Sequence, residues 1–291
     1  MAQTLDFSAR HRVDAGSFEL RAVDAGHTNG FDKEPTVDMR DELIARMDVL
    51  QSRLYGEGAR SLLVVFQGLD AAGKDGTIRH VMSGLNPAGT RVASFKQPSH
   101  EELAHDFLWR CQRALPRRGE IGIFNRSHYE DVIITRVHPE LLAPQHPSLP
   151  ADDPKFWTQR YESINDWERH LRRNGTTMIK FMLHISRDEQ RERLIARIDD
   201  ERKNWKASPA DFEERKHWDD YQRAFEQALN ATSTKHAPWF CIPANRKWYA
   251  RTAVASIIVE TLEAMNPQYP TVSDETKAEL QEVKRELEAE K

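Results

Sequence analysis

The chain has 291 residues, 39% hydrophobic and 30% charged, which is enough to bury the core of one large or two small domains. Its formal net charge of −4 excludes attraction of nucleic acid by the surface as a whole, so a polyanionic ligand would need a local cluster of Arg and Lys. No apolar run approaches the roughly 20 residues that cross a bilayer, the N-terminal residues lack the pattern of a secretory signal, and two cysteines give no disulfide framework. We therefore expect a cytoplasmic protein without membrane or nucleic-acid partners.

Residues 1–58 are predicted to form an extension that packs on the core, with a helix from Asp38 to Leu54 whose apolar residues recur at spacings of three and four. Residues 59–267 are predicted to form the core itself, because short apolar runs alternate there with helical stretches. The runs are 62–67, 91–96, 121–124, 178–185 and 239–242. Strands joined through helices pair in parallel by right-handed crossovers, so we predict an α/β fold with a five-stranded parallel sheet.

The segment 68–76, which follows the first apolar run, has the pattern of a phosphate-binding loop. Gly68 and Gly73 let consecutive backbone N–H groups turn toward phosphate oxygens, and Lys74 adds an ammonium to the same site. Helical spacing from Thr77 onward directs a positive helix N-terminus at the anion. The predicted phosphate contacts in this loop are Gly68, Ala71, Ala72, Gly73, Lys74, Asp75 and Gly76.

The loop departs from the usual pattern at one position. Asp75 stands where a Ser or Thr hydroxyl normally holds magnesium, so an acid must be found elsewhere. Asp70, inside the loop, is the candidate.

Two further cations come from the segment around the second run. Lys96 ends that run and is a candidate contact for an acceptor phosphate, with an exposed strand-end lysine as the alternative. Ser99 begins a capping box, and we predict one helix from there to just before Pro116. Arg110 on this helix either binds a nucleotide phosphate or caps a surface.

The third run ends in 125–131, which we expect to face the same crevice as the loop, because ligands bind beyond the carboxyl ends of parallel strands. Arg126 would present its planar fork to phosphate oxygens. Asn125 stands where a magnesium-binding strand end usually has Asp. Glu130 and Asp131, about one helical turn further on, are candidates to supply the missing charge directly or through water.

The remaining segments frame this core. Five prolines between His138 and Pro154 predict a surface loop, and 187–232 hold two charged helical segments separated at 207–209. Residues 268–291 form a tail rich in Glu and Lys, predicted as a solvated helix or a partly disordered segment.

Several of these segments together resemble the polyphosphate kinase 2 family. The loop 68–76 is similar to that family's Walker A loop with an Asp inside it, and 124–127 to its Walker B region. Further similar segments are 95–98, 106–110 and 243–249. The resemblance spans about residues 35–267.

The resemblance implies a P-loop kinase-like three-layer fold with a helical lid at about 187–232. It also implies transfer of the terminal phosphate of inorganic polyphosphate to AMP and/or ADP, or the reverse reaction forming polyphosphate from ATP. The implied cofactor is Mg²⁺, with Mn²⁺ as an alternative, and the implied assembly is a homo-oligomer.

It further implies roles for four catalytic residues. Asp70 would bind the metal and Lys74 would hold phosphates between donor and acceptor, while Arg126 would contact the transferring or acceptor phosphate. The sequence 125–131 is similar to the subgroup that accepts both nucleoside mono- and diphosphates, so Glu130 is the candidate for setting the acceptor range and a second metal ligand.

Cations of the charged segment are predicted to close over polyphosphate, as in the lid of the family. Since Glu189 lies four residues before Arg193, a solvated helix is the alternative. The predicted lid contacts are Arg193, Arg197, Lys203 and Lys206. Four tryptophans are candidates for stacking on a base, although apolar packing is favoured for each: Trp109, Trp157, Trp167 and Trp205.

Two other functions compete with this reading. The first is an ATP-dependent nucleoside monophosphate kinase of the thymidylate kinase type, which differs only in its phosphate donor. The second is a P-loop module without turnover, which Asp75 and Asn125 favour because each replaces a usual magnesium-binding residue.

Overall fold

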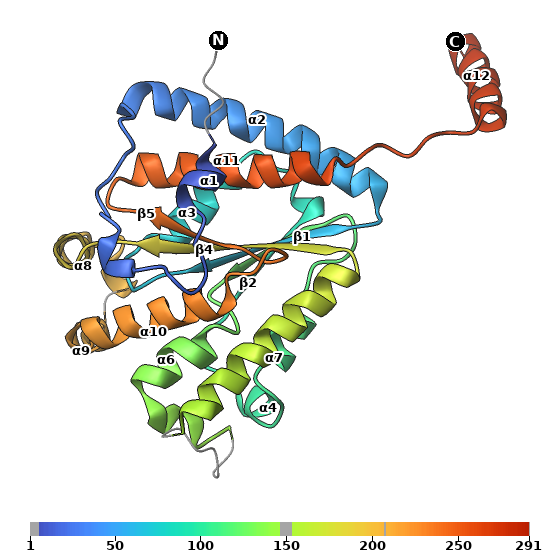
Figure 1. Cartoon of the computed structure of the whole chain (residues 1–291). Helices are drawn as coiled ribbons and strands as arrows, with labels where there is room; N and C mark the ends of the chain where they lie inside the picture. Colours follow the sequence, from blue (N-terminus) through green and yellow to red (C-terminus); the bar gives the residue numbers. More distant parts are fainter. Residues whose placement is uncertain (1–5, 146–152, 207, 291) are drawn as a thin grey trace.

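The computed structural model describes residues 6–145, 153–206 and 208–290, and its centre is a five-stranded parallel sheet (Figure 1). The strand order is β2-β3-β1-β4-β5. The strands are β1 (Ser61–Gln67), β2 (Thr90–Ser94), β3 (Ile121–Asn125), β4 (Thr176–His184) and β5 (Trp239–Pro243). They agree closely with the five predicted runs, and the predicted α/β fold is confirmed.

The central strand shows why apolar runs become strands here. Every residue of β1 is buried, and Val64 pairs with Ile123 of β3 on one side and Ile179 of β4 on the other. A strand covered on both faces and both edges carries a continuous apolar run instead of an alternating one. The same order brings the ends of β1 and β3 side by side, so the loops that follow them share one edge of the sheet.

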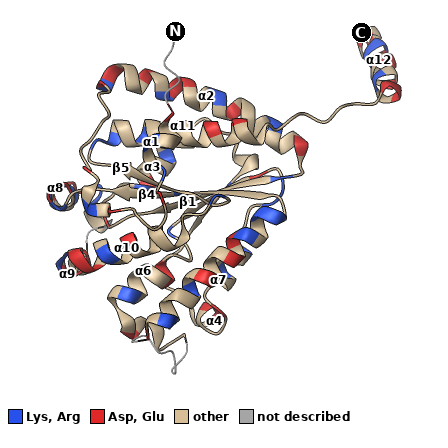
Figure 2. Ribbon diagram, in the orientation of Figure 1, with Lys and Arg blue, Asp and Glu red and all other residues tan. Residues whose placement is uncertain are grey.

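Helices cover both faces and make three layers (Figure 1). One face carries α1 (Phe7–His11), α2 (Lys33–Glu57), α3 (Lys74–Val81) and α11 (Lys247–Met265). The other carries α6 (Glu130–Val137), α7 (Pro154–Arg173) and α10 (Trp218–Thr232). Acidic and basic residues are both spread over these helices (Figure 2), in keeping with the formal net charge of −4.

The remaining elements lie at the edges of these layers. Beyond the carboxyl ends of the strands are α8 (Arg187–Asp199), η4 (Asn204–Lys206) and α9 (Pro209–Lys216) (Figure 1). The other short elements are η1 (Leu20–Ala22), η2 (Pro87–Gly89), α4 (His100–Leu103), α5 (Trp109–Arg113) and η3 (Pro139–Leu142). A last helix, α12 (Asp274–Ala289), stands off the body (Figure 1). In the part of the chain that the structure describes, no helix is long and apolar enough to span a membrane.

Some predicted elements differ in extent. The single helix expected from Ser99 to Pro116 is wrong: its capping box is present, but the segment forms α4 and α5. The break occurs because the Asp106 side chain accepts a hydrogen bond from the Leu108 amide at 3.0 Å, an alternative to helical bonding. The helix predicted from Asp38 to Leu54 is longer at both ends, running from Lys33 to Glu57.

Two other segments are more ordered or more buried than their composition suggests. The extension before α2 is anchored in the core through Phe7 and Leu20, both fully buried. The predicted surface loop from 138 to 154 contains η3, while 146–152 lie outside the described residues. Within the predicted lid, α10 buries its apolar face against α6 and α7, which leaves α8, η4 and α9 facing the sheet edge.

Candidate active site

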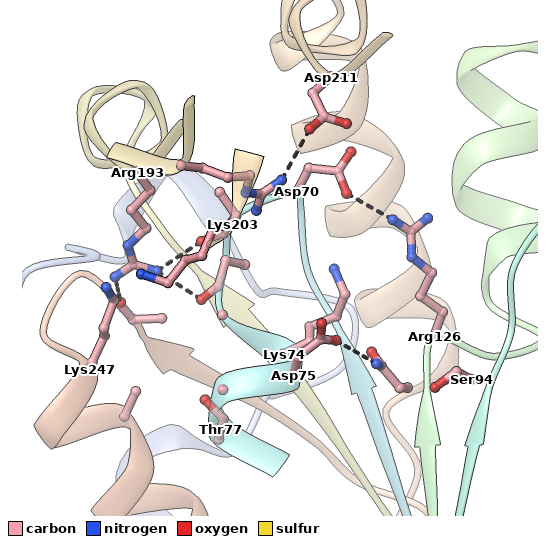
Figure 3. Close-up of a pocket in the computed structure, with 18 of the residues that line it drawn as sticks. Asp70, Lys74, Asp75, Thr77, Ser94, Arg126, Arg193, Lys203, Asp211 and Lys247 are labelled. Carbon is pink, nitrogen blue, oxygen red and sulfur yellow. Dashed lines mark hydrogen bonds and ion pairs between the residues drawn. The ribbon is translucent and has the colours of Figure 1, made fainter. Parts of the chain in front are cut away.

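A cleft of about 880 Å³ opens at the carboxyl ends of the strands (Figure 3). It is lined by the loop after β1, by the ends of β2 and β3, by α8 and η4, and by the first turns of α11. The predicted residues that line it are Asp70, Ala71, Ala72, Gly73, Lys74, Asp75, Gly76, Lys96, Asn125, Arg126, Arg193, Arg197 and Lys203. Parallel strands thus bring residues more than 100 positions apart to one edge, as the topology of such sheets predicts.

The loop after β1 has a backbone that only certain residues allow. Gly68 has a φ of +151°, and a Cβ there would lie 2.8 Å from the carbonyl oxygen of Leu183. Gly73 has a φ of +103° and caps α3. Ala71 is left-handed with a φ of +61° although it has a side chain, which is a strained conformation held by its surroundings.

Lys74 is buried at the base of this loop. Its Nζ donates hydrogen bonds to the carbonyl oxygens of Gly68 at 2.5 Å and Leu69 at 3.2 Å. Burial, reinforced by the nearby charge of Arg126, lowers the pKa of Lys74 to about 8. The ammonium is therefore held ready to exchange carbonyl partners for phosphate oxygens, which would favour its charged form.

Arg126 joins the loop to α6. It follows β3 in a left-handed conformation, with a φ of +64°. Its Nη2 donates to Oδ1 of Asp70 at 2.8 Å, and its Nη1 lies 3.4 Å from Oε2 of Glu130. The structure thus brings together three of the predicted catalytic residues from two segments, the loop after β1 and residues 125–131.

Asp70 and Arg126 also line a second, smaller cavity of about 220 Å³. Glu130 lines this cavity and not the large cleft. One wall is aliphatic and aromatic and comes from α6 and α10, with Ile133, Ile134, Trp218, Tyr221 and Phe225. Another is polar and comes from α8 and α9, with Gln190, Asp211, Glu214 and Arg215. Asp70 and Arg126, together with Asp211, therefore stand where the large cleft and the smaller cavity meet.

The two departures from the usual phosphate-loop pattern contact each other. The side-chain amide of Asn125, at the end of β3, donates to Oδ1 of Asp75 at 2.7 Å. Asp75 occupies the position of the usual hydroxyl, and Asn125 that of the usual acid. The contact joins the loop to β3 directly, a pairing that spacing in the sequence does not reveal.

Asp131 and Arg110 lie away from the cleft lining. Arg110 donates to the carbonyl oxygen of Lys96 at 2.8 Å and lies 3.8 Å from the Asp131 carboxylate. Gln145 also donates to that carboxylate, at 2.6 Å, and Arg160 to the Asp131 carbonyl oxygen at 2.8 Å. Burial raises the pKa of Asp131 to about 6 despite these cations. In this structure both residues hold α6 and the end of β2 in place.

Arg193, which was predicted to bind polyphosphate, instead forms hydrogen bonds with other residues of the protein. Its Nε donates to Glu189 at 2.7 Å. One Nη donates to the carbonyl oxygens of Ala71 at 3.0 Å and Ala72 at 2.9 Å, and the other to those of Ala244 at 2.6 Å and Asn245 at 3.1 Å. These contacts use all five N–H donors of the guanidinium. Arg193 therefore ties α8 to the phosphate loop and to the turn before α11 (Figure 3).

The other predicted lid cations are more accessible. Arg197 pairs with Asp211 of α9 at 3.1 Å, and Lys203 pairs with Asp200 at 2.6 Å. The side chain of Lys206 lies outside the described residues. Of the candidate tryptophans, Trp157 is buried as favoured, whereas Trp205 is 75% exposed at the cleft.

Two cations of the cleft were not predicted from the sequence. Lys247 begins α11 and Arg251 lies one turn later, and both line the cleft. Partial burial, followed by neighbouring cations, lowers the pKa of each. The signal that could have found Lys247 is the basic pair at 246–247 within 243–249, a segment that already carried part of the family resemblance, whereas Arg251 lies just beyond it.

The carboxylates of the site fit a magnesium ion held jointly with substrate. Among the described residues, no group of three or more His, Cys, Asp or Glu is arranged to hold a metal alone. Mg²⁺ usually takes one or two carboxylates, with phosphate oxygens and water completing its shell. Asp70, which uses one carboxylate oxygen for Arg126 and lies where the two cavities meet, meets that requirement, with Glu130 beside it.

A parallel α/β sheet, a phosphate loop and converging cations define a phosphotransferase of the P-loop kinase-like class. The family model of polyphosphate kinase 2 (PPK2) matches residues 31–270. The chain belongs to the polyphosphate kinase 2 family.

Relatives and solved structures agree with this assignment. An ADP-polyphosphate phosphotransferase of Rhodopseudomonas palustris is 49% identical over 279 residues, which cover 95% of this chain and 94% of that protein. An AMP/ADP-polyphosphate phosphotransferase of Meiothermus ruber is 48% identical over 264 residues, covering 90% and 95%. The crystal structure of polyphosphate kinase 2 from Arthrobacter aurescens superposes with a TM-score of 0.88 at 40% identity, covering 96% of both chains.

Proposed function

We propose that this enzyme transfers the terminal phosphate of inorganic polyphosphate to AMP and ADP, reversibly and with Mg²⁺. The observation that carries the proposal is the meeting of two different cavities at Asp70 and Arg126. Phosphoryl transfer needs two anionic substrates on either side of one charge-neutralising centre.

The walls of the two cavities suit different substrates. The larger one carries Lys203, Lys247 and Arg251 beyond the phosphate loop, a row of cations suited to a chain of phosphates. The smaller one combines an aromatic and aliphatic wall from α6 and α10 with polar side chains of α8 and α9, a mixture suited to the base and the sugar hydroxyls of a nucleotide. We therefore assign polyphosphate to the larger cleft and the nucleoside part of the acceptor to the smaller cavity.

The residues at the junction provide charge and position. Lys74 and Arg126 bind phosphate oxygens, and the N–H groups of the loop orient the transferring group. Asp70, with Glu130, would hold Mg²⁺, which supplies neutralisation of phosphate charge when bound. No strong general base is required, because the second pKa of a phosphate monoester is about 6 and the acceptor is already largely ionised at neutral pH.

The donor decides between this function and an ATP-dependent nucleoside monophosphate kinase. Purified protein is assayed with AMP or ADP and polyphosphate, and in parallel with AMP and ATP. We expect rapid formation of ADP and ATP from polyphosphate. Efficient transfer from ATP to AMP with none from polyphosphate would overturn the proposal, and no turnover with any donor would favour a binding module.

The role of Asp70 is tested by Asp70→Asn, which keeps the shape of the side chain. We expect loss of transfer, an unchanged melting temperature and weaker Mn²⁺ binding in the presence of nucleotide. Asp188→Asn, on an exposed side chain of α8, is the matched control and is expected to behave as wild type. Undiminished transfer by Asp70→Asn would refute the metal role.

The proposal also covers the location and the assembly of the protein. A cytoplasmic location is consistent with Cys111 and Cys241, which are free and buried. A homo-oligomer is expected from the family resemblance.

A further inference from the structure

The helix α12 carries an apolar stripe that the body of the protein does not cover. All of its described residues are exposed, and Leu280, Val283 and Leu287 are 54%, 48% and 60% exposed. Figure 1 shows the helix separated from the body by an extended segment. Three large apolar side chains on one face of a solvated helix indicate a surface that another element covers.

The spacing of this stripe is that of a coiled coil. Leu280, Val283 and Leu287 are separated by three and four residues, and they occupy heptad positions a, d and a. In this register Lys277 and Lys284 fall at the e positions, and Glu279 and Glu286 fall at the g positions. Lysine at e and glutamate at g flank the apolar seam on opposite sides, and Figure 2 shows both charge types on this helix.

The charges at e and g select the orientation of a partner helix. In a parallel coiled coil, each g residue faces the e residue five positions later in the partner helix. Glu279 would then face Lys284 of a second copy, which is an attractive pair. In an antiparallel arrangement, g faces g and e faces e, so glutamates would oppose glutamates and lysines would oppose lysines.

Pairs within the helix do not account for the apolar stripe. Lys284 lies 3.7 Å from Glu288, and Arg285 lies 2.8 Å from Glu282. Such pairs stabilise an exposed helix in isolation. They give no reason for large apolar residues at every a and d position between 280 and 287, whereas self-association does.

We propose that α12 packs in parallel and in register against α12 of other copies of this chain. The stripe spans little more than one heptad, too short to hold chains together alone, so the helix adds to contacts between the bodies of the protomers. Leu at a with a β-branched residue at d favours bundles of more than two strands. The helix thus acts as a terminal clamp on the oligomer.

Cross-linking tests the register, because Cys111 and Cys241 are both buried and any exposed thiol would be the introduced one. In the full-length chain, Leu287→Cys places a thiol at an a position, where parallel helices face each other. Arg285→Cys, at the outward f position, is the matched control. We expect a disulfide-linked species from Leu287→Cys under mild oxidation and at least tenfold less from Arg285→Cys. Equal cross-linking of both variants, or none of either, would overturn the proposal.

Charge reversal tests the orientation. Sedimentation or light scattering across a dilution series measures the self-association of each variant. Glu279→Lys and Lys284→Glu, made singly, should weaken self-association roughly threefold to tenfold, since exposed charge pairs contribute modestly. The double variant should restore self-association, although the carboxylate introduced at position 284 still lies next to that of Glu288 in the same helix. Stronger association in Lys284→Glu alone would indicate antiparallel helices, and a wild-type monomer would refute the clamp.

Discussion

Replacing Arg193 by lysine should impair catalysis although the positive charge is kept. Arg193 uses five N–H donors on Glu189 and on four carbonyl oxygens, and two of these oxygens belong to Ala71 and Ala72 in the phosphate loop. Lysine has three donors, so at least two of these bonds are lost. The side chain is only 8% exposed, which limits replacement of those bonds by water.

The expected decrease in kcat/KM follows from the number of hydrogen bonds that are lost. Two bonds from a charged donor, at about 1.5 kcal/mol each, amount to about 3 kcal/mol. If all of this loss appears in the transition state, kcat/KM falls roughly 100-fold, since each ~1.4 kcal/mol is a factor of ten. We expect most of the fall in kcat, because a displaced loop misorients the transferring phosphate.

Steady-state kinetics and hydrogen exchange distinguish positioning from charge. Arg193→Lys should increase exchange of the amides in 68–76 and 244–246, with other core amides unchanged. Arg197→Lys is the matched control, because that arginine lies one turn away and, among the described residues, pairs with a single carboxylate, that of Asp211 at 3.1 Å. If Arg193→Lys keeps wild-type kcat/KM and protection while Arg193→Met loses activity, then Arg193 acts through its charge and the reasoning is refuted.

Three further predictions concern the junction and the core. Glu130→Asn removes the carboxylate beside Arg126 and should depress use of AMP more than of ADP; equal losses in kcat/KM would contradict this. Lys74 has a pKa lowered to about 8 by burial, so the free enzyme loses that charge as pH rises and kcat/KM for polyphosphate should fall through about pH 8. Lys74→Arg should remove this inflection. Lys180→Met removes the ammonium that lies 2.6 Å from the fully buried Glu168, so that this carboxylate keeps only its contacts with Tyr129 and His128 among the described residues. Chemical denaturation should show a loss of about 3–5 kcal/mol, largely recovered by adding Glu168→Gln; equal losses in single and double variants would exclude that cause.

Local patterns were sufficient to predict the strands and the phosphate loop. A strand inside a covered parallel sheet must be apolar throughout, so five runs identified five strands to within a few residues. Gly68, Gly73 and Lys74 identified the loop because a backbone that surrounds phosphate excludes side chains at defined places. The interruption of the helix after β2 was not predicted, because the capping box at Ser99 shows where a helix begins but not where it ends. The hydrogen bond from the Leu108 amide to the Asp106 side chain separates α4 from α5.

For several charged residues the sequence was compatible both with binding a ligand and with a purely structural role. Arg193 and Arg197 lie on one helix face and carry the same charge, yet one is saturated by carbonyl oxygens and the other pairs with a single carboxylate. Asp131 follows Glu130 directly, but it faces the buried Arg110. The burial and the partners of these side chains depend on elements that are distant in the sequence, so residue spacing does not predict them.

The five strands, the phosphate loop and the family resemblance were thus predictable from the sequence, because they depend on short-range geometry and on residue types at fixed spacing. The tertiary structure decided the strand order, which places the ends of β1 and β3 together. It also decided that Asn125 bonds Asp75 and that Lys247 and Arg251 join the cleft. Those contacts form only when distant segments pack, because a side chain's charge and hydrogen bonds are assigned by its neighbours in space.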